Sequence, residues 1–146
     1  MSKRAGQVDG LALQGTPGPW NAITDVPDVL VGHTTLIEGD GPLVVGQGPV
    51  RTGVTVVVPH EGRIWEEPLF AGCHRLNGNG ELTGLEWVRE SGTLTSPIAL
   101  TNTHSVGIVR DALVAAQVRE RDPQELFWST PVVGETWDGI LNDVNG

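Results

Sequence analysis

The sequence predicts a mixed α/β fold, and three features carry that prediction. The 146 residues include 20 glycines and 10 prolines, more helix-breaking residues than a helical bundle tolerates. The β-branched run from Thr52 to Pro59 is typical of a strand. Apolar residues recur at helical spacing after Ser105, which indicates a long helix. A chain of this length suits one domain of ordinary size.

The N-terminal residues 1–18 are rich in Gly and Pro, and we expect an irregular arm there. The basic residues Lys3 and Arg4 are not followed by an apolar stretch, so no secretory signal is expected. No segment approaches membrane-spanning length. We therefore expect a cytoplasmic location, with export by a removed leader left open.

Charge and cysteine content limit the kinds of partner. The chain has 18 acidic and 9 basic residues, a formal net charge of −9. Such a field repels a phosphate backbone, so nucleic-acid binding is not expected. The acids are dispersed, as on a soluble surface, and their field also favours substrates with a free amine. Cys73 is the single cysteine, which excludes an intrachain disulfide and a cysteine-rich zinc site.

The first half of the chain is predicted to form strands. Apolar residues alternate over 28–35, which predicts a strand before a turn at 38–41. The run 52–59 is apolar almost without interruption, so we expect burial on both faces of that strand. A third strand is expected within 69–76, before the two turn dipeptides of 77–80.

A short helix is predicted after those turns. Thr83 and Glu86 have the spacing of a capping box, in which each side chain satisfies a free backbone N–H. The helix is expected to bury Leu85 and Val88 and to end at Gly92. The apolar segment 97–100 is then expected to form a buried strand.

The clearest helix is predicted from Val106 to Arg121. Ser105 is a suitable N-cap, and Arg119 lies in the last turn, where positive charge opposes the helix dipole. Asp122 and Pro123 end the helix. Its apolar face is formed by Val106, Val109, Leu113 and Ala116 or Gln117.

A metal site and a nucleotide site are both weakly supported. The four histidines lack the i, i+4 spacing of two ligands on one helix face, and structural roles are expected for them. They are His33, His60, His74 and His104. The glycines at 78, 80 and 84 are spaced one residue too far for the dinucleotide fingerprint. Turn formation explains them as well, and the functional interpretation we prefer is a rigid wall beside a pocket.

No residue of this chain is a convincing nucleophile. The sequence has no GxSxG elbow, and Cys73 lacks the local signature of a thiol enzyme. Ser105 is better explained as a helix cap. No cofactor is expected.

A group of acidic residues follows a further predicted strand at 130–134. Glu135 and Asp138 stand on either side of Trp137 in what we expect to be a loop. Sites gather on loops that leave strand ends in α/β folds. A carboxylate beside an aromatic ring suits an ammonium group, through charge pairing and cation–π attraction. An ordinary polar loop explains the same residues, and composition alone favours that interpretation.

Five segments, taken in order along the chain, favour the binding-site interpretation over an ordinary polar loop. They are Pro19–His33, Val50–His60, Asn77–Leu85, Pro97–Gly107 and Pro131–Gly146. Together they resemble the DmpA/BapA family of β-aminopeptidases and L-aminopeptidase/D-esterases. They cover nearly everything after residue 18. One such segment is weak evidence, whereas five in the family's order are strong.

The resemblance implies an N-terminal-nucleophile hydrolase with the αββα four-layer sandwich shared with ornithine acetyltransferases. In such enzymes a precursor cleaves itself before a serine, and that serine, at the start of the new β chain, attacks the substrate carbonyl. Residues 19–146 then correspond to the N-terminal part of the α chain. The rest of the αββα domain, with the nucleophile, is expected outside this sequence.

The resemblance also assigns substrate binding. In the family an acidic α-chain residue grips the free amino group of the substrate, and Glu135 is the matching position. Trp137 is assigned to the wall of the side-chain pocket. The implied activity is removal of N-terminal residues, β-amino acids included, from short peptides, amides or esters. The implied partners are the β chain and further αβ copies, often four, without nucleic acid or membrane.

Two other functions stay open on the sequence. One is a non-catalytic fragment or binding domain of the same fold, without a serine-started companion chain. The other is acyl transfer of the ornithine acetyltransferase kind.

Overall fold

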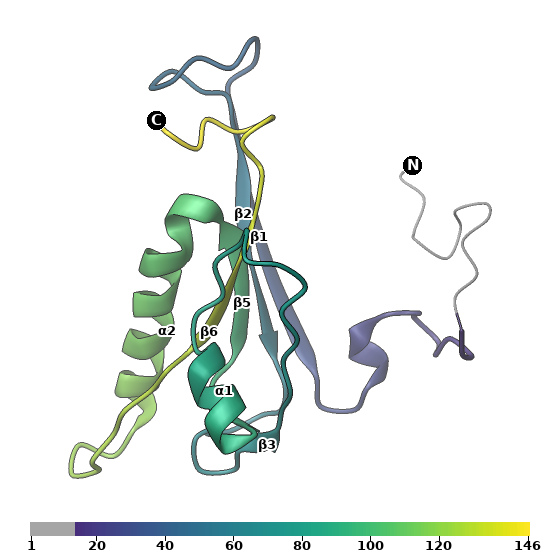
Figure 1. Ribbon diagram of the computed structural model, residues 1–146, viewed down its shortest axis with the longest axis vertical. Coiled ribbons are helices and arrows are strands. Elements are labelled where there is room, and N and C mark those ends of the chain that lie inside the picture. Colours follow the sequence, from purple (N-terminus) through teal and green to yellow (C-terminus); the bar gives the residue numbers. More distant parts are fainter. Residues whose placement is uncertain (1–13) are drawn as a thin grey trace.

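The computed structural model describes residues 14–146, which form a mixed α/β structure around one main sheet (Figure 1). The four strands lie in the order β1-β2-β5-β6. The first three pair antiparallel, and β6 runs parallel to β5. The bounds are β1 (Leu30–Glu38), β2 (Val50–Val58), β5 (Ile98–Asn102) and β6 (Val132–Thr136).

A second, two-stranded sheet pairs β3 (Leu69–Phe70) with β4 (Thr93–Leu94). The strand predicted within 69–76 therefore has only two residues. β6 is shifted from the predicted 130–134, so Glu135 lies inside a strand rather than in the loop after it.

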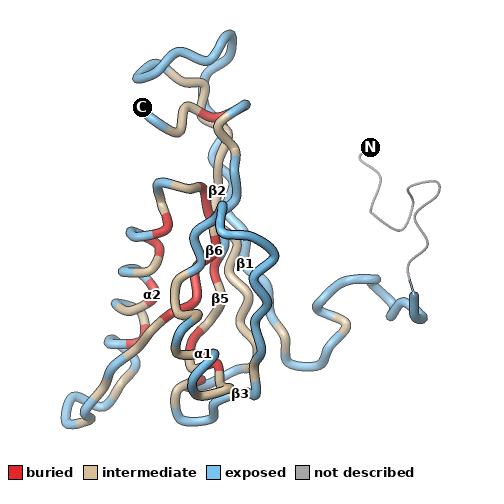
Figure 2. Tube along the Cα trace, in the orientation of Figure 1, coloured by how far each residue is buried: buried red, intermediate tan, exposed pale blue. Residues whose placement is uncertain are grey.

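The core lies between the sheet and helix α2 (Val106–Glu120), and Figure 2 shows buried residues on α2, β5 and β6. Ala99 of β5 and Val133 of β6 pack there against Val106, Val109 and Leu113. This apolar helix face agrees with the predicted spacing. The buried Gln117 extends it and is the less apolar of the two residues expected there.

A smaller cluster covers part of the opposite face of the sheet. Successive strand residues point to opposite faces, so Val132 points away from α2. It packs with Val88 of α1 (Leu85–Ser91) and Leu94 of β4.

β1 and β2 are less covered than the sequence predicts. β1 is exposed along its whole length, and every residue of β2 is only partly buried (Figure 2). The expectation of burial on both faces of 52–59 is therefore wrong for this structure. The reason is that α2 packs mainly on β5 and β6, while Val54 and Val56 of β2 only border its cluster.

The predicted capping box at α1 is wrong. The N-cap is Gly84, in the left-handed region with φ 74°, and no side chain caps the helix. The Thr83 hydroxyl instead donates to the Pro131 carbonyl at 2.7 Å and accepts from Val133 N at 2.9 Å. Glu86 pairs with Arg89 at 2.7 Å. The helix ends at Gly92, as predicted.

Ser105 holds the N-cap position of α2, but its hydroxyl forms no cap hydrogen bond. The Asn102 side chain supplies one instead, accepting from Ser105 N at 3.0 Å. It thereby caps the 3-10 helix η3 (Thr103–Ser105), which leads into α2.

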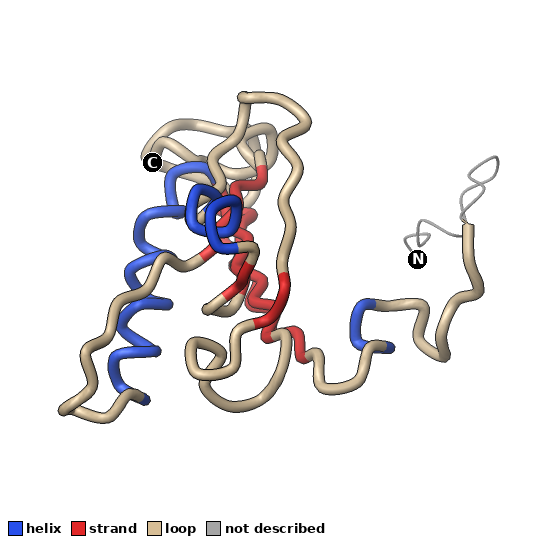
Figure 3. Tube along the Cα trace, turned by 60° about the horizontal axis from the view of Figure 1, so that its bottom comes forward, coloured by secondary structure: helices blue, strands red, loops and turns tan. Residues whose placement is uncertain are grey.

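The segment before β1 runs outward from the sheet and holds the 3-10 helix η2 (Ile23–Asp25) (Figure 3). Of the predicted irregular arm, residues 1–13 lie outside the described residues, and 14–18 contain no helix or strand. None of the helices within 14–146 combines the length and apolar character of a membrane span.

Candidate functional site

A pocket of about 710 Å³ lies at the C-terminal ends of β5 and β6. Because these two strands are parallel, the residues that end them reach the same edge of the sheet. The pocket is lined by Gly78, Asn79, Gly80, Glu81, Thr103, Glu135 and Trp137. The structure thus brings both predicted binding residues, Glu135 and Trp137, to one cavity.

One wall of the pocket is the glycine-rich segment that precedes α1. Glu135 N donates to Glu81 O at 3.0 Å, and Thr83 N donates to Val133 O at 3.0 Å. Leu82 bridges Gly134 between these bonds, so residues 81–83 run antiparallel along the outer edge of β6. This pairing places Gly78 and Gly80 beside the cavity, as the wall interpretation of the glycines predicts.

The pocket is acidic. Glu135 is half-buried, Glu81 is exposed, and the seven lining residues include no Lys, Arg or His. Within residues 14–146 neither carboxylate has a hydrogen-bond or ion-pair partner. Two carboxylates without a neutralising cation make this cavity attractive to a positively charged ligand.

Thr103 adds a polar group that sequence reasoning missed. Its Oγ1 is buried and has no hydrogen-bond partner among the described residues. A buried hydroxyl without a partner is unusual in a folded protein. Since Thr103 also lines the pocket, a ligand group is one candidate partner for it.

Trp137 follows β6 directly and lines the pocket. Its side chain is 64% exposed. Thr136 Oγ1 donates to Thr101 O at 3.1 Å, which fixes the chain just before the indole.

None of the histidines, Cys73 or Ser105 lines this pocket. His33 bridges two threonines of the sheet, with its Nδ1 2.6 Å from Thr55 Oγ1 and its Nε2 2.8 Å from Thr35 Oγ1. His60 contacts two carbonyl oxygens of its own loop. Among residues 14–146 no three His, Cys, Asp or Glu side chains are grouped as for a metal ion. Cys73 is exposed.

Comparison with known proteins identifies the family of this chain. The model of peptidase family S58 matches residues 21–146. The chain belongs to this family. The predicted DmpA/BapA relationship is thereby confirmed for the S58 chain.

Two curated relatives of the S58 chain are β-peptidyl aminopeptidases named BapA. The one from Sphingosinicella microcystinivorans is 50% identical over 137 residues, which cover 94% of this chain and 34% of that protein. The one from Sphingosinicella xenopeptidilytica is 48% identical over 139 residues, again covering 34% of its length. The chain thus spans about a third of the length of the curated relatives it matches.

Solved structures agree with this fold. A β-aminopeptidase of Burkholderia sp. is 59% identical with a TM-score of 0.80, over 89% of this chain and 35% of its own. The L-aminopeptidase D-Ala-esterase/amidase of Ochrobactrum anthropi is 41% identical with a TM-score of 0.79, over 94% and 39%. The latter is described as a prototype for the serine aminopeptidases with a variant of the Ntn hydrolase fold. The S58 chain therefore has part of that fold.

Proposed function

We propose that the S58 chain supplies the amine-recognition part of an aminopeptidase. The enzyme removes N-terminal residues, β-amino acids included, from short peptides, amides or esters. The observation that carries the proposal is the shared pocket of Glu135 and Trp137, which is acidic and lined by no cationic side chain. A carboxylate beside an indole attracts an ammonium group through a charge-assisted hydrogen bond and cation–π attraction. The named activities of the relatives support the same substrate class.

The assignment of Glu135 can be tested with the complete enzyme. We expect Glu135→Gln to lower kcat/KM for free-amine substrates roughly 10- to 100-fold, because a neutral amide replaces the charged partner of the ammonium. Glu120→Gln is a matched control, since it removes one exposed carboxylate at the C-terminal end of α2, whereas the pocket residue Thr103 precedes the start of that helix. It should leave kcat/KM within about twofold of wild type. Equal turnover of free and N-acetylated substrates by the wild type would refute amine recognition.

We further propose that the nucleophile is the first serine of a β chain released by self-cleavage, and that α and β chains assemble into oligomers. The part of the sheet that α1 and α2 leave uncovered supports a missing layer. A cavity of about 360 Å³ on it is bordered by Ile37, Arg51, Leu100 and others, and both Ile37 and Leu100 are exposed. β1 is exposed along its whole length, and a strand with neither face covered favours a covering partner.

Intact-mass spectrometry with N-terminal sequencing of the purified protein tests this second step. A companion chain that begins with serine is the expected result. Material without such a chain and without hydrolysis would instead establish a non-catalytic binding domain. A companion chain that begins with threonine, with acetyl exchange on acetylornithine, would establish the acetyltransferase alternative.

A further inference from the structure

The chain that follows the pocket is fastened to the start of β2. β5 pairs with β2 only from Val54 to Val57, so the first residues of β2 lack a strand on that side. Residues 142–143 occupy the vacant side. Asn142 Oδ1 accepts from Arg51 N at 2.8 Å, and Asp143 N donates to Pro49 O at 2.9 Å. A side-chain oxygen and a main-chain N–H thus replace the missing ladder bonds.

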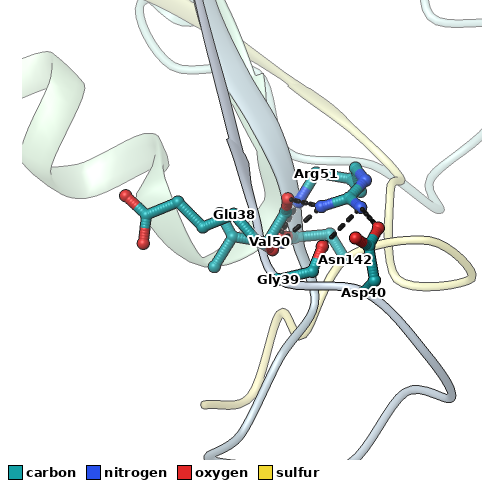
Figure 4. A network of polar contacts seen from close by, with 6 residues as sticks. All are labelled: Glu38, Gly39, Asp40, Val50, Arg51 and Asn142. Atoms are coloured by element: carbon teal, nitrogen blue, oxygen red, sulfur yellow. Dashed lines mark hydrogen bonds and ion pairs between the residues drawn. The ribbon is translucent and has the colours of Figure 1, made fainter.

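Arg51 is a firmly held anchor for this contact (Figure 4). Its guanidinium donates to the carbonyl oxygens of Glu38 at 2.9 Å, Val50 at 2.6 Å and Gly39 at 2.6 Å. It also pairs with the Asp40 carboxylate at 3.0 Å. These contacts lock the end of β1 to the start of β2.

Asn142 itself is buried, with 4% of its surface exposed. Because Arg51 N is a donor, the facing atom of Asn142 must be its oxygen, which directs Nδ2 toward the Asp138 carboxylate 3.4 Å away. The side chain thereby links the sheet to the turn that follows Trp137. A buried amide with both ends engaged fixes the position of whatever it connects.

The neighbouring residues reinforce this attachment. The Asp143 carboxylate accepts from Gly46 N at 2.6 Å and from Gly48 N at 3.3 Å. His104 Nδ1 lies 2.8 Å from the Val144 carbonyl oxygen. The segment after Asn142 is therefore held by the β1–β2 loop on one side and by η3 on the other.

Between Thr136 and Asn142 the chain has little freedom. The Asp138 carbonyl accepts from both Leu141 N and Asn142 N at 2.9 Å, which closes a tight turn. Trp137 is the one residue between that turn and the strand β6. Fixing both ends of the loop therefore limits where the indole of Trp137 can lie.

We propose that Asn142 is a positioning residue for the recognition pocket. It holds the turn at residues 138–142 against β2, and through that turn it sets the position of the Trp137 indole. The inference rests on the proposed function, because substrate affinity reports it. Asn142 does not line the pocket and acts only through Trp137 and Asp138.

The test uses Asn142→Asp, Asp138→Asn and the double variant N142D/D138N in the complete enzyme. N142D keeps the oxygen that faces Arg51 N but replaces the amide donor by a carboxylate oxygen facing Asp138. We expect KM for a free-amine substrate to rise about tenfold with kcat within about twofold of wild type. The double variant restores one donor and one acceptor across the pair. It should return KM to within about threefold of wild type.

A second readout separates this inference from the proposed function. Acrylamide quenching of tryptophan fluorescence, compared with a Trp137→Phe background, reports whether the indole moves and needs no turnover. N142D should increase quenching of the Trp137 component, and N142D/D138N should reverse the increase. Asp111→Asn, an exposed charge change on α2, should alter neither readout. Failure of amine recognition appears separately, as equal wild-type turnover of free and N-acetylated substrates.

The proposal is overturned if N142D changes neither KM nor quenching, or if the double variant fails to reverse both. Should N142D not fold, Asp138→Ala decides, because it removes the same bond while leaving the Arg51 contact intact. An unchanged KM and unchanged quenching in Asp138→Ala would then overturn the proposal, and a rise in both would support it.

Discussion

The indole of Trp137 lies against Gly139, so closely that a Cβ on Gly139 would stand 2.5 Å from Trp137 Cζ2 and 2.6 Å from Cη2. No carbon of an ordinary side chain fits between them. Gly139 is not in the left-handed region, so its backbone tolerates alanine, and the clash falls on the ring. The identity of residue 139 therefore determines where the indole rests.

We expect Gly139→Ala to displace Trp137 from the pocket wall without unfolding the protein, since the indole is exposed and can turn outward. KM for free-amine substrates should rise about three- to tenfold, with a smaller change in kcat. Gly72→Ala is the control, because a Cβ there meets nothing within 4 Å. Unchanged KM in Gly139→Ala would show that the indole's position does not matter for binding.

Glu81 and Glu135 line the same pocket but differ in burial. This difference predicts that replacing each by Gln lowers kcat/KM to a different extent. Glu81→Gln should lower kcat/KM for free-amine substrates only about two- to fivefold, because its exposed carboxylate is screened by water and salt. Raising the NaCl concentration from about 0.05 M to about 0.5 M should remove most of the kcat/KM loss caused by Glu81→Gln. A larger part of the loss caused by Glu135→Gln should remain. Kinetics at both salt concentrations measure this. An effect of Glu81→Gln as large as that of Glu135→Gln would contradict the assigned order.

Periodicity in the sequence predicted the elements that carry their own apolar pattern. The β-branched residues of 52–59 belong to β2, and Val106, Val109 and Leu113 form the buried face of α2. The capping box failed for a tertiary reason. Thr83 has the right spacing, but its hydroxyl bonds to Pro131 and Val133 across the sheet edge. Local spacing cannot reveal a competing partner almost fifty residues away.

The pocket was predictable only in part for the same reason. Glu135 and Trp137 are neighbours in the sequence, and their residue types suit an ammonium group. Glu81 and Thr103 reach the same cavity because residues 81–83 pair with the edge of β6 and because β5 lies parallel to β6. The turn glycines at 78 and 80 were the available sequence signal that the segment with Glu81 lies beside the cavity. No sequence signal indicated the buried hydroxyl of Thr103.

Alanine substitutions at the two glycines that cap α1 distinguish the cost of backbone strain from the cost of a steric clash. Gly84 and Gly92 both have positive φ, 74° and 67°, so alanine at either costs about 1 kcal/mol of folding free energy. Only at Gly84 would the added Cβ meet backbone oxygens, 2.7 Å from Thr130 O and 2.9 Å from Pro131 O. Gly84→Ala should therefore destabilise the protein by about 3 kcal/mol in total. Denaturant unfolding measures both variants, and equal losses would show that the sheet edge relaxes around the methyl group.

His60 predicts a pH-dependent loop. Its Nδ1 lies 2.6 Å from Glu61 O and its Nε2 3.0 Å from Glu67 O, so both nitrogens face acceptors. Both can donate only in the imidazolium form. The hydrogen bond to the Glu61 carbonyl, followed by that to Glu67, therefore raises the pKa of His60 above its ordinary value of 6.5.

The raised pKa fixes the direction of the effect on stability. A folded-state pKa above the unfolded one means that the folded state holds the proton more tightly. The stabilisation is thus fully present below about pH 6.5 and is lost as the pH rises through the folded-state value. The carbonyl clamp on residues 61–67 should loosen over that interval.

NMR titration of the complete protein should show His60 titrating above 6.5, and amide exchange in 61–67 should gain protection at low pH beyond the intrinsic pH effect. His60→Ala removes the clamp, so its thermal stability should change less than that of the wild type between about pH 5.5 and pH 8.5. A His60 resonance that titrates at or below 6.5 would show that the two carbonyl contacts do not hold the proton.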